Sequence, residues 1–463
     1  MNTTKEGHLR RNIERFRQIF CQVGGGIFDR VLTAGAFEKI VTATCKDFRE
    51  RIYFPLETLR LFIGQVLSED HACQGVVSRC LSERVAAGQT PSSLNTGPYC
   101  KARDRMPLDL PVRLLQEIGQ SLEAQSPQAW RWRGRVVKIF DGTTVSMPDT
   151  PENQAVFPQS PEQKPGLGFP IARLGGLIGL ASGAVIGYAL CACEGKGTGE
   201  QTLLRKMLPL IDSGDILLAD ALLTTWWIVV GAHARGADVV MPQNGQRLTD
   251  FLAGILLGRK DHVVVWPRPV RPAWMSVSEY QTWPKSLIMR EVEVGGRVLV
   301  TTLLDRDAVT PEEIDALYAM RWNIEVDFRT IKVSMEMDVL RCKQPDRVEK
   351  EVAVHLLAYN LVRWAMASAA SLGHVLPRAL GFMGAKRVLN AFADHLRHAT
   401  GKQITAIIAS VLGSIASLVL PYRPGRIDPR AKKRRPKNLP LLTVPRNEAR
   451  ELIKTQREAM TTA

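Results

Sequence analysis

Residues 1 to about 125 show the spacing of amphipathic helices. Apolar side chains recur every three or four positions, at Leu59, Leu61, Phe62, Val66 and Leu67. Basic side chains are frequent in the same segment, at Arg10, Arg11, Arg15, Arg17, Lys101, Arg103 and Arg105. An ordinary solvated helical bundle and a module that binds nucleic acid both fit this pattern, and the spacing leaves both interpretations open.

After the helical segment the spacing changes to that of short strands. Residues 135–140 form a β-branched and aromatic run that ends at Asp141, and the apolar run 216–219 ends at Asp220. A helical stretch then leads to a further strand at 237–241. Strand, helix and strand joined by short links indicate a parallel pair. Two carboxylates are therefore expected at the C-terminal ends of two strands of one mixed sheet, the edge where α/β folds place their sites.

The segment 174–193 is a run of twenty uncharged residues with five glycines. Its length alone would permit a membrane span. Fully buried strands also read as continuous apolar runs, and Gly183 follows Ala181 and Ser182 as a turn signal. Because two buried strands joined by a tight turn account for the glycines, we favour a hairpin over a membrane helix.

Residues 244–296 differ from their surroundings in composition. They hold four prolines and three tryptophans, at Pro267, Pro269, Pro272, Pro284, Trp266, Trp274 and Trp283. Short apolar runs at 263–265 and 287–289 predict strands, and a glycine pair then turns the chain into another strand at 298–304. We therefore interpret 244–296 as a β-rich insertion within the α/β domain.

Residues 350 to about 420 return to helical spacing. A run rich in basic residues and proline follows, at Arg423, Arg426, Arg430, Lys432, Lys433, Arg434, Arg435 and Lys437. Such a run is typical of a flexible arm. A solvated tail and an arm that contacts a phosphate backbone both fit it.

Charge and cysteine usage narrow the class of protein. The formal net charge is +15, an excess that favours a polyanionic partner such as nucleic acid over a basic protein that merely stays soluble. The eight cysteines form no CxxC pair, so a structural zinc site is not expected, and reduced thiols are favoured over disulfides. The polar N-terminus carries no apolar run of the signal-peptide type, which favours a cytoplasmic protein.

A helix is predicted to begin at Thr310. This residue is followed by Pro311 and, at the third position, by Glu313, which is the pattern of an N-cap, a first-turn proline and a capping box. A helix that starts here carries a polar set further along, at Tyr318, Arg321, Glu325 and Lys332. At about 100° per residue these four side chains fall within about 60° of one face.

An apolar stripe borders this polar face, at Leu317, Ile324, Phe328 and Ile331. The polar set is therefore expected to face a cleft rather than bulk water. The alternative is an ordinary ion pair between Arg321 and Glu325, which predicts charges on the solvent side of the helix. A kink at Asn323 would alter the phase of the residues before it relative to those beyond it.

The spacing Tyr318-x2-Arg321-x3-Glu325-x6-Lys332 resembles the signature of the DDE transposases of bacterial insertion-sequence family "four". The segment that begins at Asp141 with Gly-Thr-Thr is similar to the first aspartate motif of that family. Asp220, after a strand, matches the second. The sequence departs from the family pattern directly afterwards, because Ala-Leu-Leu stands at 221–223 where the family has Arg-Gly-aromatic.

The resemblance implies an RNase H-like catalytic domain with two Mg²⁺ ions, for which Mn²⁺ would substitute. Asp141 would bridge both ions, with Asp220 on one and Glu325 on the other. Arg321 and Lys332 would bind DNA phosphates, and the Tyr318 hydroxyl would form a hydrogen bond near the cleaved strand. Hard oxygen ligands suit these cations, and two of them can activate an attacking oxygen and stabilise a leaving one.

The implied reaction is cut-and-paste transposition. Water frees a 3′-OH at the end of the element, and that 3′-OH then attacks target DNA. The implied partners are double-stranded DNA, as terminal inverted repeats and as target, and a second copy of the chain in the synaptic complex. The expected location is the bacterial cytoplasm at the nucleoid, without a membrane. Family members often pass through a hairpin with a flipped base, for which Trp266, Trp274 and Trp283 are equal candidates.

These patterns together predict an α/β fold with an RNase H-like mixed sheet between helical terminal parts. The expected units are a helical DNA-end-binding region, a catalytic domain in two segments, the β-rich insertion, and a helical C-terminal region with a basic tail. Their bounds are 1–130, then 131–243 with 297–365, then 244–296, and finally 366–463.

Two other functions remain compatible with the sequence. One is a transposase-derived DNA-binding protein that has lost activity through the altered segment after Asp220. The other is a structure-selective nuclease. Six further acidic residues lie near the motifs, and most of them are expected to be solvated or capping, with Asp305 and Asp307 as weaker metal candidates: Asp149, Glu152, Asp215, Asp305, Asp307 and Asp327.

Overall fold

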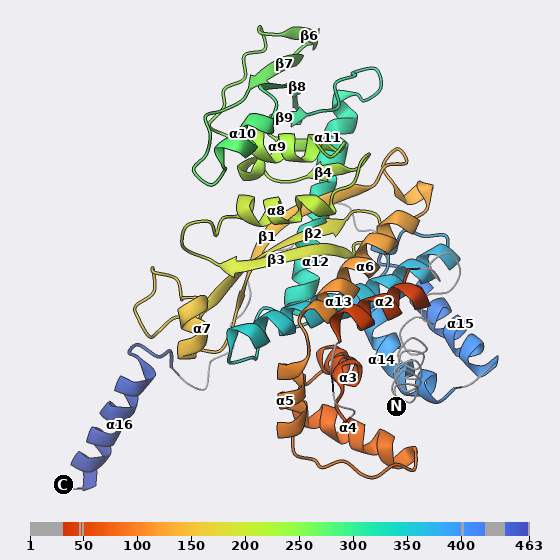
Figure 1. The fold of residues 1–463 in the computed structure, drawn as a ribbon, viewed down its shortest axis with the longest axis vertical. Coiled ribbons are helices and arrows are strands. Elements are labelled where there is room, and N and C mark those ends of the chain that lie inside the picture. The colour runs from red at the N-terminus through yellow and green to blue at the C-terminus, as the bar shows by residue number, and fades with distance from the viewer. Residues whose placement is uncertain (1–30, 46–47, 49–50, 400–401, 422–439, 462–463) are drawn as a thin grey trace.

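The structure is a computed structural model that describes residues 31–45, 48, 51–399, 402–421 and 440–461 (Figure 1). The basic run predicted between 423 and 437 lies outside these residues, as do the basic side chains before residue 18 and Cys21.

The N-terminal part is helical, as predicted. Its elements are α2 (Ala34–Thr44), α3 (Pro55–Leu67), α4 (Cys73–Ala86), α5 (Gly97–Arg105), α6 (Asp109–Gln125) and the short η2 (Gln128–Trp130). The apolar stripe of α3 is buried, with Leu59 and Phe62 at most 2% exposed. Figure 1 shows α3, α4 and α5 below the sheet and α6 beside it, and α3 and α6 pack on the long helix α13 (Pro345–Leu372).

Nine strands form one mixed sheet, in the order β3-β2-β1-β4-β5-β9-β8-β7-β6. The strands are β1 (Val137–Ser146), β2 (Ile171–Gly179), β3 (Val185–Ala192), β4 (Ile216–Leu218), β5 (Asp238–Pro242), β6 (Ile255–Gly258), β7 (Asp261–Pro267), β8 (Ser286–Val294) and β9 (Arg297–Thr301). β1, β4 and β5 are parallel, and every other pair is antiparallel. A 3-2-1-4-5 order with this mixture of directions is the RNase H-like arrangement, so the predicted fold class is confirmed.

The apolar run at 174–193 forms the hairpin of β2 and β3, as predicted. Gly183 occupies the left-handed region at the turn, with φ +73°. β2 is buried along almost its whole length because it lies between β1 and β3 and is covered on both faces. No helix in the described part of the chain is long and apolar enough to cross a membrane.

The alternation of side chains along β1 and β4 separates two apolar layers. Ile139 and Leu218 face one layer, while Phe140 and Leu217 face the other. The first layer includes helices α6, α12 (Asn323–Arg329) and α13, and the second includes α8 (Glu200–Met207) and α9 (Trp226–His233). Helices therefore cover the central strands on both sides.

Residues 244–296 lengthen the same sheet. β8 pairs with β9 and with β7, so β6, β7 and β8 continue the edge beyond β5. Figure 1 shows these strands at the far end of the molecule from the N-terminal helices. The remaining elements of this half are α7 (Pro151–Val156), η3 (Leu208–Leu210), η4 (Ala221–Leu223), α10 (Val277–Thr282) and α11 (Pro311–Ala319).

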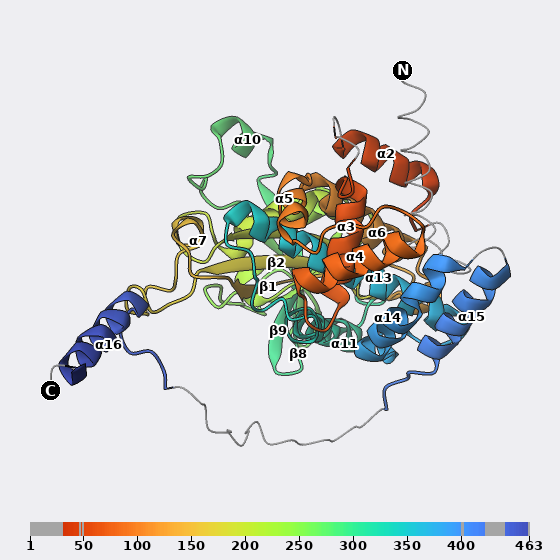
Figure 2. The same cartoon turned by 90° about the horizontal axis from the view of Figure 1, so that it is seen from below.

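The C-terminal helices extend from the end of α13. They are η7 (Pro377–Ala379), α14 (Phe382–His398), α15 (Lys402–Ala416) and α16 (Arg446–Thr461). Figure 2 shows α14 and α15 side by side against α13, whereas α16 stands apart from them. α13 is the central support of the molecule, because Val352, Leu356 and Trp364 are at most 1% exposed.

Candidate active site

Two aspartates follow the point where β1 and β4 separate. The parallel pairing of these strands ends at Ile139 and Leu218, so Asp141 and Asp220 each stand two residues beyond the last pair. The prediction that its strand ends at Asp141 is wrong, because β1 continues to Ser146 with β2 as its partner. The two carboxylates nevertheless share one edge, since that edge is set by β4 and not by the end of β1.

The segment after Asp220 is an ordered turn despite its unusual sequence. The Asp220 carboxylate accepts a hydrogen bond from the Leu223 amide at 3.2 Å and so caps η4. The Thr224 hydroxyl donates to the Pro242 carbonyl at 2.7 Å, and the Gln201 side chain donates to the Leu222 carbonyl at 2.9 Å. These contacts fix the backbone beside Asp220 without the family's Arg-Gly-aromatic segment.

The predicted helix start at Thr310 is present, but one continuous helix is not. Thr310 and Glu313 form the capping box of α11. The chain then passes through the 3-10 turn η5 (Met320–Trp322), α12 and the π turn η6 (Thr330–Ser334). The phase expected for an unbroken helix is therefore wrong beyond Ala319.

Arg321 joins two of the predicted acidic residues. Its Nη1 lies 2.9 Å from Oδ2 of Asp141, and its Nη2 lies 3.4 Å from Oε1 of Glu325. The Glu325 side chain is 41% exposed, whereas that of Asp141 is 19% exposed. The guanidinium thus stands between a strand carboxylate and a helix carboxylate at the edge of the core, as the cleft interpretation predicts.

Asp220 belongs to the same electrostatic group. Burial raises the pKa of Asp141, the Gly142 amide and Arg321 oppose this rise, and the nearby charge of Asp220 adds to it. Asp220 also helps to raise the pKa of Tyr318. The structure therefore brings Asp141, Asp220, Arg321 and Glu325 together from β1, η4, η5 and α12.

Tyr318 and Lys332 complete the predicted set. Tyr318 is buried, and the guanidinium of Arg297 lies 4.7 Å from the centre of its ring. Lys332 Nζ lies 3.2 Å from the hydroxyl of Thr143, two residues after the first aspartate. All six residues predicted for the site thus lie around the separation of β1 and β4.

The donor set suits a hard divalent cation. Its members are carboxylates, and Arg321 already supplies positive charge between Asp141 and Glu325. Within the described residues, no three acidic, histidine or cysteine side chains are placed close enough together to share one ion. The guanidinium thus occupies the position in which a cation would neutralise the same carboxylates.

The neighbouring acidic residues divide into two groups. Asp305 caps the amides of Asp307 and Ala308 at 2.9 and 3.0 Å, as expected for a capping residue. The expectation of a solvated or capping side chain is wrong for Asp327, which is fully buried with Arg363 and Arg378. It is incomplete for Asp215, which caps the Asp212 amide but is also buried in an ion pair with Lys138.

The three tryptophans of the insertion have different surroundings. Trp266 is 2% exposed and donates to Glu291 at 2.7 Å, so it is a core residue. Trp283 packs on Trp226 and Trp227. Trp274 is 48% exposed, with the Arg205 guanidinium 4.2 Å from its ring centre. Of the three, Trp274 has the surface that a base could stack on.

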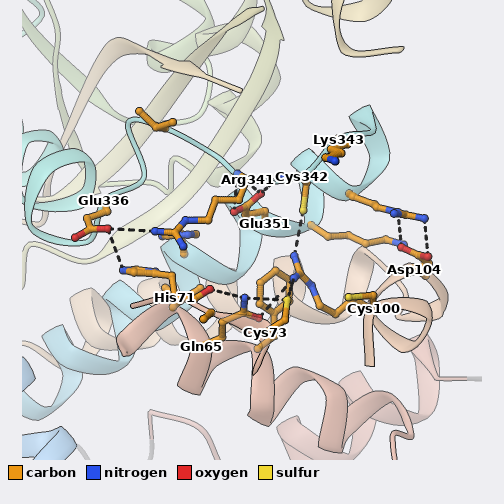
Figure 3. A pocket seen from close by; sticks show the side chains of 18 residues that line it. Gln65, His71, Cys73, Cys100, Asp104, Glu336, Arg341, Cys342, Lys343 and Glu351 are labelled. Atoms are coloured by element: carbon orange, nitrogen blue, oxygen red, sulfur yellow. Dashed lines mark hydrogen bonds and ion pairs between the residues drawn. The ribbon is translucent and has the colours of Figure 1, made fainter. Parts of the chain in front are cut away.

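A cavity of about 340 Å³ lies elsewhere, between the N-terminal helices and residues 336–355 (Figure 3). Figure 3 shows the thiols of Cys73, Cys100 and Cys342 on its walls. The Arg103 guanidinium donates to Cys342 at 3.1 Å. None of the described cysteines forms a disulfide. The walls of the cavity are formed by α3, α4 and α5 and by the segment that follows Lys332.

One acidic residue that no sequence pattern indicates lies close to the site. Glu200, the first residue of α8, lies against Gly142, and the charges of Asp220 and Asp141 help to raise its pKa. No spacing rule points to it, because it follows a glycine-rich segment and belongs to no recognised motif. The signal available in the sequence was Gly142, a glycine inside a strand, which often marks a close approach of another group.

Comparison with known proteins agrees with this geometry. A model of the transposase DDE domain matches residues 132–361. Transposase InsG of insertion sequence element IS4 from Escherichia coli K12 is 28% identical over 434 residues, which cover 90% of this chain and 92% of that protein. The transposase of insertion sequence element IS421 from Escherichia coli is 34% identical over 71 residues, 15% of this chain and 19% of that protein.

Among solved structures, the synaptic complex of piggyBac transposase with hairpin DNA has a TM-score of 0.40 and 9% identity, over 90% of this chain and 87% of that chain. The matched domain, the sheet order and the clustered acidic residues define a DDE transposase, an enzyme that cleaves nucleic acid. The chain belongs to the family of the IS4 insertion-sequence transposases.

Proposed function

We propose that this transposase cleaves the inverted-repeat ends of an insertion sequence and joins the freed ends to target DNA by a cut-and-paste route. The observation that carries the proposal is the bridge from Arg321 to both Asp141 and Glu325, with Asp220 on the same edge. The three carboxylates come from separate elements to the same edge, and the permanent cation of Arg321 contacts two of them.

Asp141, Asp220 and Glu325 would hold two Mg²⁺ ions, for which Mn²⁺ would substitute. Asp141 would serve both ions, with Asp220 on one and Glu325 on the other; the Arg321 contact that Asp141 shares with Glu325, and its charge interaction with Asp220, support this assignment. Such a pair of ions supplies an activated attacking oxygen and a stabilised leaving oxygen. The first attack by water leaves a 3′-OH, and the second attack uses that 3′-OH on target DNA.

The cationic residues of the site would receive the DNA backbone. When Asp141 and Glu325 turn to a metal ion, the Arg321 guanidinium becomes free to bind a phosphate. Lys332 exchanges its contact with Thr143 for a second phosphate. Tyr318 lies beside Arg321 and would place its hydroxyl near the cleaved strand. These contacts would orient the scissile phosphate and would not read the base sequence of the DNA.

The proposed substrate is double-stranded DNA, and two copies of the chain would hold two ends together in the synaptic complex. The net charge of +15 supports a polyanionic partner of this size. We assign end binding to the helical region before residue 130, and catalysis to 131–243 with 297–365. Action on bacterial DNA would take place at the nucleoid.

Cleavage of end DNA tests the proposal. The wild-type chain is incubated with a duplex that carries the inverted repeats flanking its gene, in the presence of Mg²⁺ or Mn²⁺. Defined cuts at the repeat ends are expected, Glu325→Gln should abolish them, and the exposed Glu312→Gln should leave them unchanged. Tight binding of the ends without cleavage under any metal would instead identify an inactive DNA-binding derivative. Cuts at branched junctions irrespective of sequence would identify a nuclease.

A further inference from the structure

Glu200 is held beside the catalytic carboxylates by contacts on both sides of it. The Thr198 carbonyl accepts hydrogen bonds from Arg173 of β2 at 3.1 Å and from the Cys191 thiol of β3 at 3.2 Å. On the other side, Gln201 binds the backbone of η4 next to Asp220. The first turn of α8 is therefore tied both to the sheet and to the turn that carries Asp220.

The side chain of Glu200 lies directly on the backbone of β1. A Cβ atom added at Gly142 would stand 2.3 Å from Oε1 of Glu200 and 2.6 Å from its Cδ. Gly142 is not among the glycines with positive φ, so its backbone conformation does not require glycine. Glycine is required at position 142 because a side chain there would collide with the carboxylate of Glu200, next to Asp141.

The Glu200 carboxylate has no direct ion-pair partner among the described residues, and Arg173 is the cation whose charge acts on it. Within the described part of the chain, no hydrogen bond or ion pair is made by Glu200, although the side chain is partly buried. Burial raises the pKa of Glu200 most, the negative charges of Asp220 and Asp141 raise it further, and the positive charge of Arg173 opposes this rise. Repulsion among three neighbouring carboxylates is unfavourable, and a cation bound near them would relieve the part of it that Arg173 does not offset.

We propose that Glu200 is a fourth carboxylate of the catalytic site and helps Asp141 and Asp220 to hold a divalent cation. The inference rests on the proposed function, because it requires metal binding at Asp141. The four carboxylates would surround the site. Glu200 and Asp220 would lie on the sheet side of Arg321, and Glu325 would lie on the helix side of Arg321. Gly142 is then part of the site, since it lets Glu200 approach.

The competing explanation is a structural one. Glu200 stands at the N-terminus of α8, where any acidic side chain interacts favourably with the helix dipole. That role would be filled equally well by aspartate, whose carboxylate is one methylene shorter. Metal coordination instead depends on reach, so Glu200→Asp separates the two explanations.

Mn²⁺ binding to the full-length protein provides the test, with unbound Mn²⁺ measured by electron paramagnetic resonance. Glu200→Gln is expected to raise the Kd for Mn²⁺ about tenfold or more, the usual effect of losing one group from a metal site. Glu200→Asp is expected to raise it as well, although it keeps the charge. Glu194→Gln removes an exposed glutamate from the same loop and is expected to bind like the wild type.

The outcomes are distinguishable. If Glu200→Gln or Glu200→Asp binds Mn²⁺ as the wild type does, while Asp141→Asn loses binding, the inference about Glu200 is overturned and the proposed function stands. If Asp141→Asn and the wild type bind alike, the proposed metal site itself fails. An equal loss in Glu194→Gln would show general charge attraction and would also overturn the inference. Thermal unfolding of each variant verifies that it is folded.

Discussion

Arg321 Nη1 lies 2.9 Å from Asp141 Oδ2, across 180 positions of sequence. The contact links the 3-10 turn between α11 and α12 to the middle of β1, and the same guanidinium reaches Glu325 at 3.4 Å. One cation therefore neutralises two carboxylates that the proposed mechanism assigns to metal ions. Under the proposed function, Arg321 would compete with the metal in the free protein and would bind phosphate in the complex.

Replacement of Arg321 should accordingly have opposite effects on the two ligands. Arg321→Gln is expected to tighten Mn²⁺ binding about threefold in the absence of DNA, because a like charge is removed from the site. It is expected to weaken binding of inverted-repeat DNA about tenfold, through loss of one charged phosphate contact. Paramagnetic resonance and fluorescence anisotropy measure the two Kd values. Weaker binding of both ligands would show that Arg321 shapes the site instead of competing for it.

The buried carboxylate of Asp327 should be among the strongest contributors to stability near the site. It accepts hydrogen bonds from Tyr359, Arg363 and Arg378 at 2.7 to 3.1 Å and fixes α12, which carries Glu325, on α13 and η7. Asp327→Asn is expected to cost about 3–5 kcal/mol of unfolding free energy, because it leaves buried cations without their partner.

Urea unfolding measures this cost. The exposed Asp338→Asn serves as the control and is expected to change stability by no more than about 0.5 kcal/mol. Equal midpoints for the two variants would mean that the buried network does not hold α12 in place.

His355 should make the protein less stable in mild acid. Burial lowers the pKa of His355 to about 3, and the charges of His71, Arg103, Lys386 and Arg341 contribute to the decrease. Between the ordinary pKa near 6.5 and this value, the unfolded chain binds a proton that the folded chain does not. The folded state is therefore disfavoured as the pH falls below about 6.5, by about 2 kcal/mol at pH 5.

His355→Gln removes the titrating imidazole, so neither the folded nor the unfolded state binds this proton. The free energy of unfolding of the wild type should fall relative to this variant when urea titrations at pH 7 and pH 5 are compared. Parallel changes in the two proteins would show that His355 titrates normally in the folded chain.

The sequence predicts the local parts of the site well. Short apolar runs locate Asp141 and Asp220, because a strand that is buried on both faces leaves a continuous apolar signature. The capping box at Thr310 is also correct, since its hydrogen bonds join residues three positions apart. The hairpin of β2 and β3 follows from glycines placed where only a strand and a turn accommodate them.

The predictions that are wrong concern contacts between residues distant in the sequence. β1 continues past Asp141 because β2 pairs with it, and no pattern within β1 encodes that partner. The helix that begins at α11 changes to 3-10 and π turns without a proline or glycine at either break, so its sequence gives no warning. Asp327 looks like a surface residue until Arg363 and Arg378 are placed beside it by the fold.

If Asp141, Asp220 and Glu325 act as one site, catalysis requires Asp220 even though the segment after it departs from the family pattern. Single-turnover cleavage of inverted-repeat DNA in Mg²⁺ should fall at least about a thousandfold in Asp220→Asn. The exposed Asp212→Asn, only eight positions earlier, should cleave at the wild-type rate. Cleavage at the wild-type rate by Asp220→Asn would show that the three carboxylates do not act as one site.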